Sequence, residues 1–203
     1  MSNEDFIKMI GKASQKAYPK YRILPSLTIA QAILESNWGR SGLARDCYNY
    51  FGMKWKDDCG CDFKEYLTKE QKPDGTYYSV MARFRKYPDA KAGIEGYYKF
   101  LTGYKRYANL IGETDPMRAC DLIRQDGWAT SLKYSENLKS LIRKHGLASW
   151  DAGSRPEEPA GLDAIAREVI DGKWGNGQER KQRLRDAGYD PVEVQGKVNE
   201  ILR

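Results

Sequence analysis

Apolar residues recur at helical spacing along most of the first 150 residues. This spacing predicts helices at residues 3–18, 26–36, 89–103, 116–125 and 136–145. Ser26 is a candidate N-cap for the second of these helices, and Gly39 lies just beyond its end. Asp115 and Pro116 suit the cap and first residue of the fourth helix, and Ser135 is a candidate cap for the last.

Residues 62–86 follow a different pattern. Every second residue is apolar or aromatic at Tyr78, Val80, Ala82 and Phe84, and the turn sequence Pro73-Asp74-Gly75 precedes this stretch. Such alternation after a turn is typical of a β-hairpin. We therefore expect an α+β fold, in which a mostly helical domain carries a small β-hairpin lobe.

A break in this periodicity divides the chain. Residues 149–160 combine prolines, charges and small residues, and they predict a linker between a domain at 1–148 and a smaller one at 161–203. Helical spacing then returns in three short stretches, the last introduced by Asp190 and Pro191. The smaller domain is thus expected to be a three-helix bundle, only marginally stable alone.

The net charge is shared unevenly between these parts. Residues 1–150 contain 25 Lys and Arg against 17 Asp and Glu, whereas residues 151–203 contain 9 against 11. A basic surface attracts any polyanion, but no nucleic-acid-binding motif occurs, so nucleic acid is not an expected partner. No apolar run approaches the roughly 18 residues that cross a bilayer, and the N-terminus lacks a signal-peptide pattern. We therefore expect synthesis in a cytoplasm and no stable membrane insertion.

Four cysteines and one histidine restrict the available metal chemistry. The spacing of Cys59 and Cys61 is too tight for the common zinc knuckle, and His145 is distant in sequence. No metal or other cofactor is expected. The thiols would stay free in a reducing cytoplasm, whereas Cys47 could pair with Cys59 or Cys61 in an oxidising exterior.

Glu35 stands at the end of an apolar helix, in the segment AQAILESNWGRSGLA at residues 30–44. Apolar neighbours, the ring of Trp38 one turn further on, and the negative end of the helix dipole all favour the protonated form of a carboxyl group here. Protonation of a glycosidic oxygen requires such an acid. From these residues alone, an ordinary solvated acid at a helix end remains the alternative.

The same segment, followed by YNYFGMKWK, resembles the signature of glycoside hydrolase family 73. This family is the glucosaminidase domain of autolysins, phage endolysins and flagellar muramidases. The resemblance continues in order through LTKEQKPDGTYYSVMARFRKYPD, GYKRYANLIG and GWATSLKYSENLKSLI, and it covers nearly all of residues 5–147. It implies a lysozyme-like fold that acts on peptidoglycan.

By this resemblance Glu35 is the general acid and Glu70 the second carboxylate, with Glu65 as a competitor for the second role. Tyr134 matches the tyrosine that the family places beside the acid, although the preceding residues 131–133 depart from the family pattern. Further substrate-binding positions implied are Trp38, Asn49, Phe51, Tyr107 and Trp128. Core packing is the alternative role for several of these aromatic residues.

The separation of the two carboxyl groups would set the stereochemical outcome. About 5–5.5 Å implies a covalent intermediate, and about 6.5–9.5 Å leaves room for an attacking water. We expect Glu35 to protonate the leaving oxygen and Glu70 to orient water or stabilise positive charge, with Tyr134 as a supporting polar group.

The C-terminal block resembles the CW-type-seven (CW_7) cell-wall-binding repeat of phage lysins, most closely in REVIDGKWGNGQER and AGYDPVEVQ. The resemblance implies a three-helix bundle that binds the disaccharide-peptide unit of peptidoglycan. Candidate ligand contacts are Arg167, Trp174, Asn176 and Tyr189. For the two aromatic residues, closure of the small core is the alternative. A single module would gain avidity from a homo-oligomer or from the catalytic cleft as a second contact.

Both halves of the chain point to one polymer. The sequence predicts an endolysin, an endo-β-N-acetylglucosaminidase that cleaves the β-1,4 bond after N-acetylglucosamine in the bacterial cell wall. Without a signal peptide, its release would need a membrane pore made by another protein. The alternatives are a muramidase or a lytic transglycosylase acting on the same polymer, or a wall-binding protein without catalysis.

Overall fold

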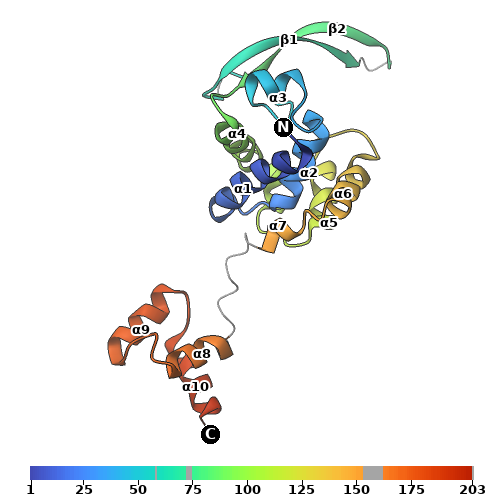
Figure 1. Ribbon diagram of the computed structural model, residues 1–203. Coiled ribbons are helices and arrows are strands. Elements are labelled where there is room, and N and C mark those ends of the chain that lie inside the picture. The colour runs from blue at the N-terminus through green and yellow to red at the C-terminus, as the bar shows by residue number, and fades with distance from the viewer. Residues whose placement is uncertain (58, 72–74, 153–161, 203) are drawn as a thin grey trace. The chain divides into compact units, whose positions relative to one another are not determined.

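The computed structural model describes residues 1–57, 59–71, 75–152 and 162–202, and for residues 69–71 it describes the backbone alone. The chain divides into two compact units, Met1–Ser154 and Arg155–Arg203. Each unit, drawn in Figure 1, has its own hydrophobic core.

The first unit is a body of helices gathered around α2 (Figure 1). Its helices are α1 Asn3–Tyr21, α2 Pro25–Ser36, α3 Gly42–Cys47, α4 Ala90–Gly103, the 3₁₀ helix η1 Lys105–Leu110, α5 Pro116–Gln125, α6 Tyr134–Lys144 and α7 Ser149–Ala152. Helices α1, α5, α6 and α7 all contact α2. Every residue of α2 from Pro25 to Ile33 is consequently buried. The mostly helical fold with one small sheet agrees with the expectation from the sequence.

The start of α2 corrects the predicted N-cap. Ser26 is not the N-cap, because Pro25 takes the first helical position and Leu24 the cap position. The backbone N–H of Ser26 instead donates to Asp151 Oδ1 at 2.8 Å. A buried carboxylate at this point accepts a hydrogen bond from a backbone amide that has no partner within the helix. The positive end of the helix dipole also stabilises its negative charge.

Helix α7 therefore belongs to the body, although the predicted linker begins at residue 149. Its Trp150 packs on α1 at Gly11, where a Cβ atom would lie only 2.5 Å from the indole ring. Gln15 Nε2 also donates to the carbonyl of Trp150 at 2.9 Å. The rest of the predicted linker, residues 153–160, lies outside the described residues. A smaller correction concerns α6, which begins at Tyr134, so that Ser135 is a buried helical residue.

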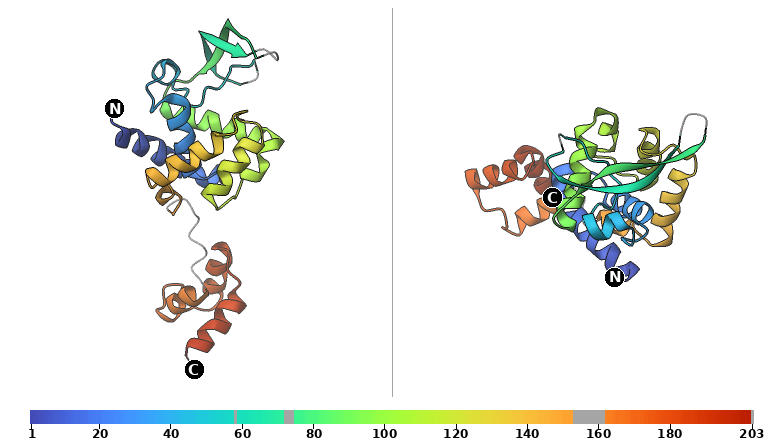
Figure 2. Two further views of the ribbon diagram at one scale, coloured as in Figure 1. Left: turned by 90° about the vertical axis from the view of Figure 1, so that its right-hand side faces the viewer. Right: turned by 90° about the horizontal axis from the view of Figure 1, so that it is seen from above.

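The hairpin consists of β1 Asp62–Gln71 and β2 Tyr77–Lys86, paired antiparallel with Thr68 opposite Val80. The two strands form a ribbon that extends over the α3 end of the body (Figure 2). A separate β-bridge joins Lys54 to Phe84 at its base. The hairpin expected at residues 62–86 is therefore present, and it is joined to the body near its base.

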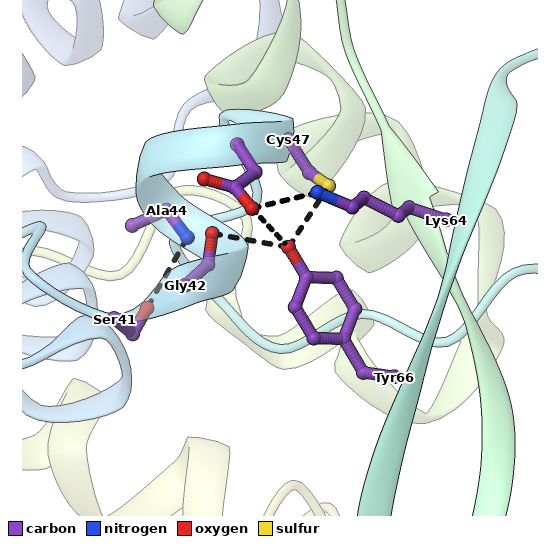
Figure 3. Close-up of polar contacts among 7 residues, drawn as sticks. Ser41, Gly42, Ala44, Cys47, Lys64 and Tyr66 are labelled. Carbon is purple, nitrogen blue, oxygen red and sulfur yellow. Dashed lines mark hydrogen bonds and ion pairs between the residues drawn. The ribbon is translucent and has the colours of Figure 1, made fainter.

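Tyr66 connects this ribbon to α3 (Figure 3). Its hydroxyl lies 2.9 Å from Asp46 Oδ2 and 3.3 Å from the carbonyl oxygen of Gly42. Lys64 Nζ donates to the same oxygen of Asp46 at 2.7 Å. Burial, together with the hydrogen bond to Asp46, raises the pKa of Tyr66 to about 12. The phenol thus keeps its proton near neutral pH and can donate a hydrogen bond to Asp46 of α3.

The cysteines differ from the expected pairing. Cys59 and Cys61 form a disulfide with each other, and Cys47 and Cys120 are buried thiols. Cys47 does not meet either partner, because its sulfur lies at the contact of α3 with the hairpin, 3.8 Å from the hydroxyl of Tyr66. Burial raises the pKa of the Cys120 thiol to about 12, which makes it a poor nucleophile.

The second unit contains α8 Leu162–Ile170, α9 Gly177–Asp186 and α10 Pro191–Ile201. Its core consists of Ile165, Ala166, Val169, Leu184, Val194 and Val198. Helix α10 begins as the sequence predicts, with Pro191 in its first turn and Asp190 Oδ1 accepting from the N–H of Val192 at 2.7 Å. None of the helices described in either unit combines the length and apolar character that a bilayer crossing requires.

Candidate active site

Glu35 is the last residue but one of α2, and a left-handed turn follows it. Asn37, Trp38 and Gly39 have φ angles of 49°, 62° and 72°. A bulky residue in this region costs roughly 1–2 kcal/mol, so tertiary contacts must hold the turn. Ser36 Oγ accepts from the N–H of Gly39 at 2.7 Å, and a Cβ on Gly39 would lie 2.7 Å from the ring of Phe6. The turn ends α2 at Ser36, one residue after Glu35, whose side chain is exposed.

The ring of Trp38, which was expected to cover Glu35, packs against two other rings. Its ring centroid is 5.0 Å from that of His145 and 6.4 Å from that of Phe6, both in edge-on contacts. The indole ring beside Glu35 is that of Trp128, which is 93 residues further along the chain. Trp38 thus stabilises the left-handed turn, and Trp128 provides the aromatic contact to the acid.

Two donors converge on one oxygen of Glu35. The hydroxyl of Tyr134 donates to Oε1 at 2.6 Å, and Trp128 Nε1 donates to the same atom at 3.0 Å. Burial and the neighbouring carboxylate of Glu35 raise the pKa of Tyr134 well above its usual value, so the phenol remains a donor. Both donors bind Oε1, and no hydrogen bond among the described residues reaches Oε2.

A buried hydrogen-bond chain positions Tyr134 in turn. Gln31 Nε2 donates to the hydroxyl of Tyr134 at 3.0 Å, and the hydroxyl of Tyr97 donates to Gln31 Oε1. Gln31 and Tyr97 are fully buried. A satisfied network in a low-dielectric interior fixes its members in one arrangement. Gln31 precedes Glu35 by about one helical turn and therefore lies on the same face of α2. Helical periodicity could have identified Gln31 as a residue of the site.

Beside these groups lies a cavity of about 800 Å³. Of the residues predicted from the sequence, it is lined by Glu35, Phe51, Tyr107, Trp128 and Tyr134. Its lining also contains residues that the sequence analysis did not single out, namely Gly52, Met53, Lys54, Lys56, Phe100, Tyr104, Arg106, Gly127 and Ala129. Most of these come from the loop before the hairpin and from the α4–η1 corner. No local pattern relates either segment to α2.

Asn49 is not among the residues that line this cavity, and it is only 1% exposed. Its Nδ2 donates to the carbonyls of Met53 and Arg85 at 2.8 and 3.0 Å, and its Oδ1 accepts from the N–H of Met53 at 3.0 Å. All of its polar atoms are therefore engaged within the protein. This geometry favours a role in shaping the loop that carries Phe51 over direct contact with a sugar.

The two candidates for the second carboxylate lie on the hairpin. Glu65 Oε1 accepts from Arg83 Nε at 3.1 Å in an exposed ion pair. The backbone of Glu70 pairs with Tyr78, and the side chain of Glu70 lies outside the described part of the structure. Successive residues of a strand alternate between its two faces. Positions 65 and 70 are five residues apart, so they belong to opposite faces of that alternation.

In the second unit, the four candidate contacts have different surroundings. Arg167 is exposed on α8. Trp174 Nε1 donates to Glu168 Oε2 at 3.0 Å, and the rings of Trp174 and Tyr189 meet edge to face at 6.0 Å against the core. Asn176 Oδ1 accepts from an Arg180 side-chain nitrogen at 2.8 Å.

Two hollows lie on this unit. One, of about 530 Å³, includes Trp174 among its lining residues. The other, of about 500 Å³ between α9 and α10, is lined by none of the four candidates but includes Arg180, Lys181 and Arg185. Within the residues that the structure describes, no group of three or more His, Cys, Asp or Glu side chains in either unit is arranged to hold a metal ion.

Comparison with known protein families assigns both units. Residues 11–147 match the glucosaminidase family, described as mannosyl-glycoprotein endo-beta-N-acetylglucosaminidase, and residues 163–202 match the CW_7 repeat. Among solved structures, the catalytic domain of the autolysin Auto from Listeria monocytogenes is similar with a TM-score of 0.65 and 30% identity, over 73% of this chain and 87% of that one.

Two curated proteins are similar to different parts of the chain. The exo-glucosaminidase LytG of Bacillus subtilis (strain 168) is 29% identical over 192 residues, which cover 90% of this chain and 66% of LytG. The lysozyme of Streptococcus phage Cp-7 is 65% identical over 40 residues, which cover 20% of this chain and 12% of that protein. The chain thus spans slightly less than two thirds of LytG and only a small part of the phage lysozyme.

Proposed function

Because the chain belongs to the glucosaminidase family of glycoside hydrolases, we propose that it cleaves the β-1,4 bond after N-acetylglucosamine in bacterial peptidoglycan. The observation that carries this proposal is the carboxyl group of Glu35, fixed by Tyr134 and Trp128 at the edge of an aromatic-lined cavity. Sugars offer apolar faces to aromatic rings, and a glycosidic oxygen needs a positioned acid.

In this mechanism Glu35 protonates the leaving oxygen from Oε2. The two donors at Oε1 keep the carboxyl group in one orientation and stabilise the carboxylate that forms when the proton leaves. Tyr134 acts as a neutral donor throughout, which the raised pKa of its phenol supports. The chain of Gln31 and Tyr97 behind Tyr134 keeps this arrangement in place before substrate binds.

Glu70 is the preferred second carboxylate, and it orients the attacking water or stabilises positive charge on the sugar. The ion pair of Glu65 with Arg83 supports this choice, because it occupies the competing carboxylate. Glu70→Gln should reduce kcat by about 100-fold, whereas Glu65→Gln should stay close to the wild type. Equal effects of the two substitutions would contradict the choice of Glu70 over Glu65 as the second carboxylate.

The second unit binds the wall polymer and keeps the enzyme on its substrate. The match to the CW_7 repeat supports this role, and so does the identity of this segment to part of a phage lysozyme. The same likeness supports an endolysin, which reaches the wall from the cytoplasm of the host cell. LytG is named as an exo-acting enzyme, so the size of early products must decide between endo and exo cleavage here.

Digestion of purified peptidoglycan, followed by reduction and mass spectrometry of the fragments, tests the proposal. The wild type should release fragments with N-acetylglucosamine at the reducing end, and Glu35→Gln should lower the rate by about 10²–10⁴-fold. Glu4→Gln, an exposed acid of α1, serves as the control. Muramic acid ends would show a muramidase, anhydro ends a lytic transglycosylase, and an undigested wall a binding protein.

A further inference from the structure

The cavity beside Glu35 is strongly basic. Lys54, Lys56 and Arg106 all line it, and Glu35 is the only carboxylate among its described lining residues. N-acetylglucosamine carries no charge, so binding of that sugar alone gives no reason for several cations. An anionic group on the substrate would give one, because opposite charges attract most strongly inside a concave, partly desolvated site.

Lys56 and Arg106 converge on the ring of Tyr104. Lys56 Nζ donates to the hydroxyl of Tyr104 at 3.0 Å and lies 5.5 Å from the ring centroid. The guanidinium carbon of Arg106 lies 5.8 Å from the same centroid and 4.6 Å from that of the buried Tyr107. The two cations are therefore held on one aromatic platform by side chains that line the cavity.

Arg106 also lies close to the loop that positions the catalytic acid. A Cβ atom on Gly127 would be 3.5 Å from Arg106 Nη1. The next residue, Trp128, donates the hydrogen bond to Glu35 Oε1. A group bound at Arg106 would therefore lie near the bond that is cleaved.

The described part of the structure gives neither of these two cations a neutralising partner. Within the described residues, no carboxylate forms an ion pair with Lys56 or Arg106, whereas Lys64, Arg83 and Lys139 each have one. Contacts with an aromatic face hold a cation in place without cancelling its charge. Two such cations on one ring repel each other, and an anion placed between them would relieve this repulsion.

We propose that Lys56 and Arg106 bind a carboxylate on the substrate and so make charge a determinant of which wall segments are cleaved. The inference rests on the proposed peptidoglycan substrate. In that polymer carboxylates belong to the muramic acid unit, either on its lactyl group or on the peptide attached there. The planar fork of arginine suits a carboxylate in bidentate geometry, and the lysine adds a point charge.

The ratio of kcat/KM on two forms of one substrate tests this inference. The forms are purified peptidoglycan and the same material after its carboxyl groups have been amidated with carbodiimide and ammonia. The wild type should prefer the untreated form by about 3- to 10-fold, a preference that weakens as salt is added. Lys56→Gln/Arg106→Gln should abolish this ratio, and a general loss of folded protein would not change it.

Lys105→Gln is the matched control. It removes one exposed positive charge next to Arg106 in sequence, from a residue that does not line the cavity, and the ratio should stay at the wild-type value. A second comparison uses glycan stripped of peptide, before and after amidation of its lactyl groups. A persistent preference there shows that the site accepts the lactyl carboxylate that peptide removal frees, and a lost preference assigns the peptide.

Two results would overturn the inference: equal cleavage of both forms by the wild type, or an unchanged ratio in the double variant. Either would leave the proposed function intact, because reducing ends would still be released. If the wild type released no reducing ends from any form, the proposed function itself would fail.

Discussion

The two units of this chain bury different kinds of side chains. The body encloses polar and charged residues as well as apolar ones, including Gln31, Asn49 and Asp151. Among the described residues of the second unit, the buried set is entirely apolar and contains six side chains. A buried polar group is tolerated only where the fold supplies its hydrogen-bond partners, and this requires a large, well-packed core.

This difference determines which side chains of each unit can serve catalysis or binding. In the body, the residues that hold Glu35 also contribute to stability, because their polar atoms satisfy one another inside the core. In the second unit, exposed side chains such as Arg167 can serve ligand binding without contributing to the core. Substitutions should therefore couple stability to function in the body and separate them in the second unit.

The largest effect is expected for Leu184→Ala in the second unit. Leu184 is 1% exposed within a six-residue core, and its truncation should cost about 3 kcal/mol, enough to unfold a unit of this size. Calorimetry should show the transition of the body unchanged, and binding to peptidoglycan sacculi should be lost. Val192→Ala, at a side chain that is 78% exposed, is the control. A shift in the body's transition would contradict this prediction.

Next in size is Gln31→Leu in the body. It leaves the hydroxyls of Tyr97 and Tyr134 without their shared partner, so the free energy of unfolding should fall by about 2 kcal/mol. We also expect kcat to fall by about 10-fold with KM little changed, because Tyr134 loses the side chain that positions it against Glu35.

Ser14→Ala is the control for this prediction. Ser14 is also a buried polar residue, but its hydroxyl donates to the carbonyl of Ile10 within α1. Its removal should leave kcat unchanged. If both variants lost activity equally, stability alone would explain the effect of Gln31→Leu.

A smaller effect is expected at the end of the body, for Asp151→Ala. Removal of the carboxylate that accepts from Ser26 should cost about 1 kcal/mol, measured by chemical denaturation. Asp151→Asn keeps an acceptor oxygen and should recover part of this loss. The activity of the folded enzyme should not change in either variant. Stability equal to the wild type in both would mean that residues 149–152 behave as part of the linker.

The smallest effect is expected for Asp121→Asn, which removes an ion pair between α5 and α6. Hydrogen bonds from Lys139 and Ser135 hold the pKa of Asp121 below its usual value of 3.8. A lowered pKa means stabilisation that is present above that value and lost as the pH falls through the pKa of the folded state. Because the side chain is 42% exposed, about 0.5 kcal/mol is expected at neutral pH.

Chemical denaturation across a pH series checks this sign. The difference between wild type and Asp121→Asn should be constant near neutral pH and should shrink as the pH falls below about 4. A difference that grew on acidification would mean that Asp121 is destabilised as a carboxylate in the folded protein.

The sequence by itself determined the elements whose signals are local. The bounds of α5 and the start of α10 agree with their Asp-Pro sequences, and the paired strands agree with the alternation at residues 78–84, whereas most of the predicted turn lies outside the described residues. In each case the deciding interactions join residues a few positions apart, so a short window contains them. The resemblance of the segment around Glu35 to a known signature likewise needed only neighbouring residues.

Only the tertiary structure decided what surrounds Glu35 and what caps α2. Trp128 reaches Glu35 across 93 residues, and Asp151 reaches Ser26 across 125. The platform of Lys56, Tyr104 and Arg106 likewise joins a loop to a distant helical corner. The physical reason is that such pairs meet only when separate helices pack into one core. The periodicity of a sequence predicts which face of a helix is buried, but it does not identify the element against which that face packs.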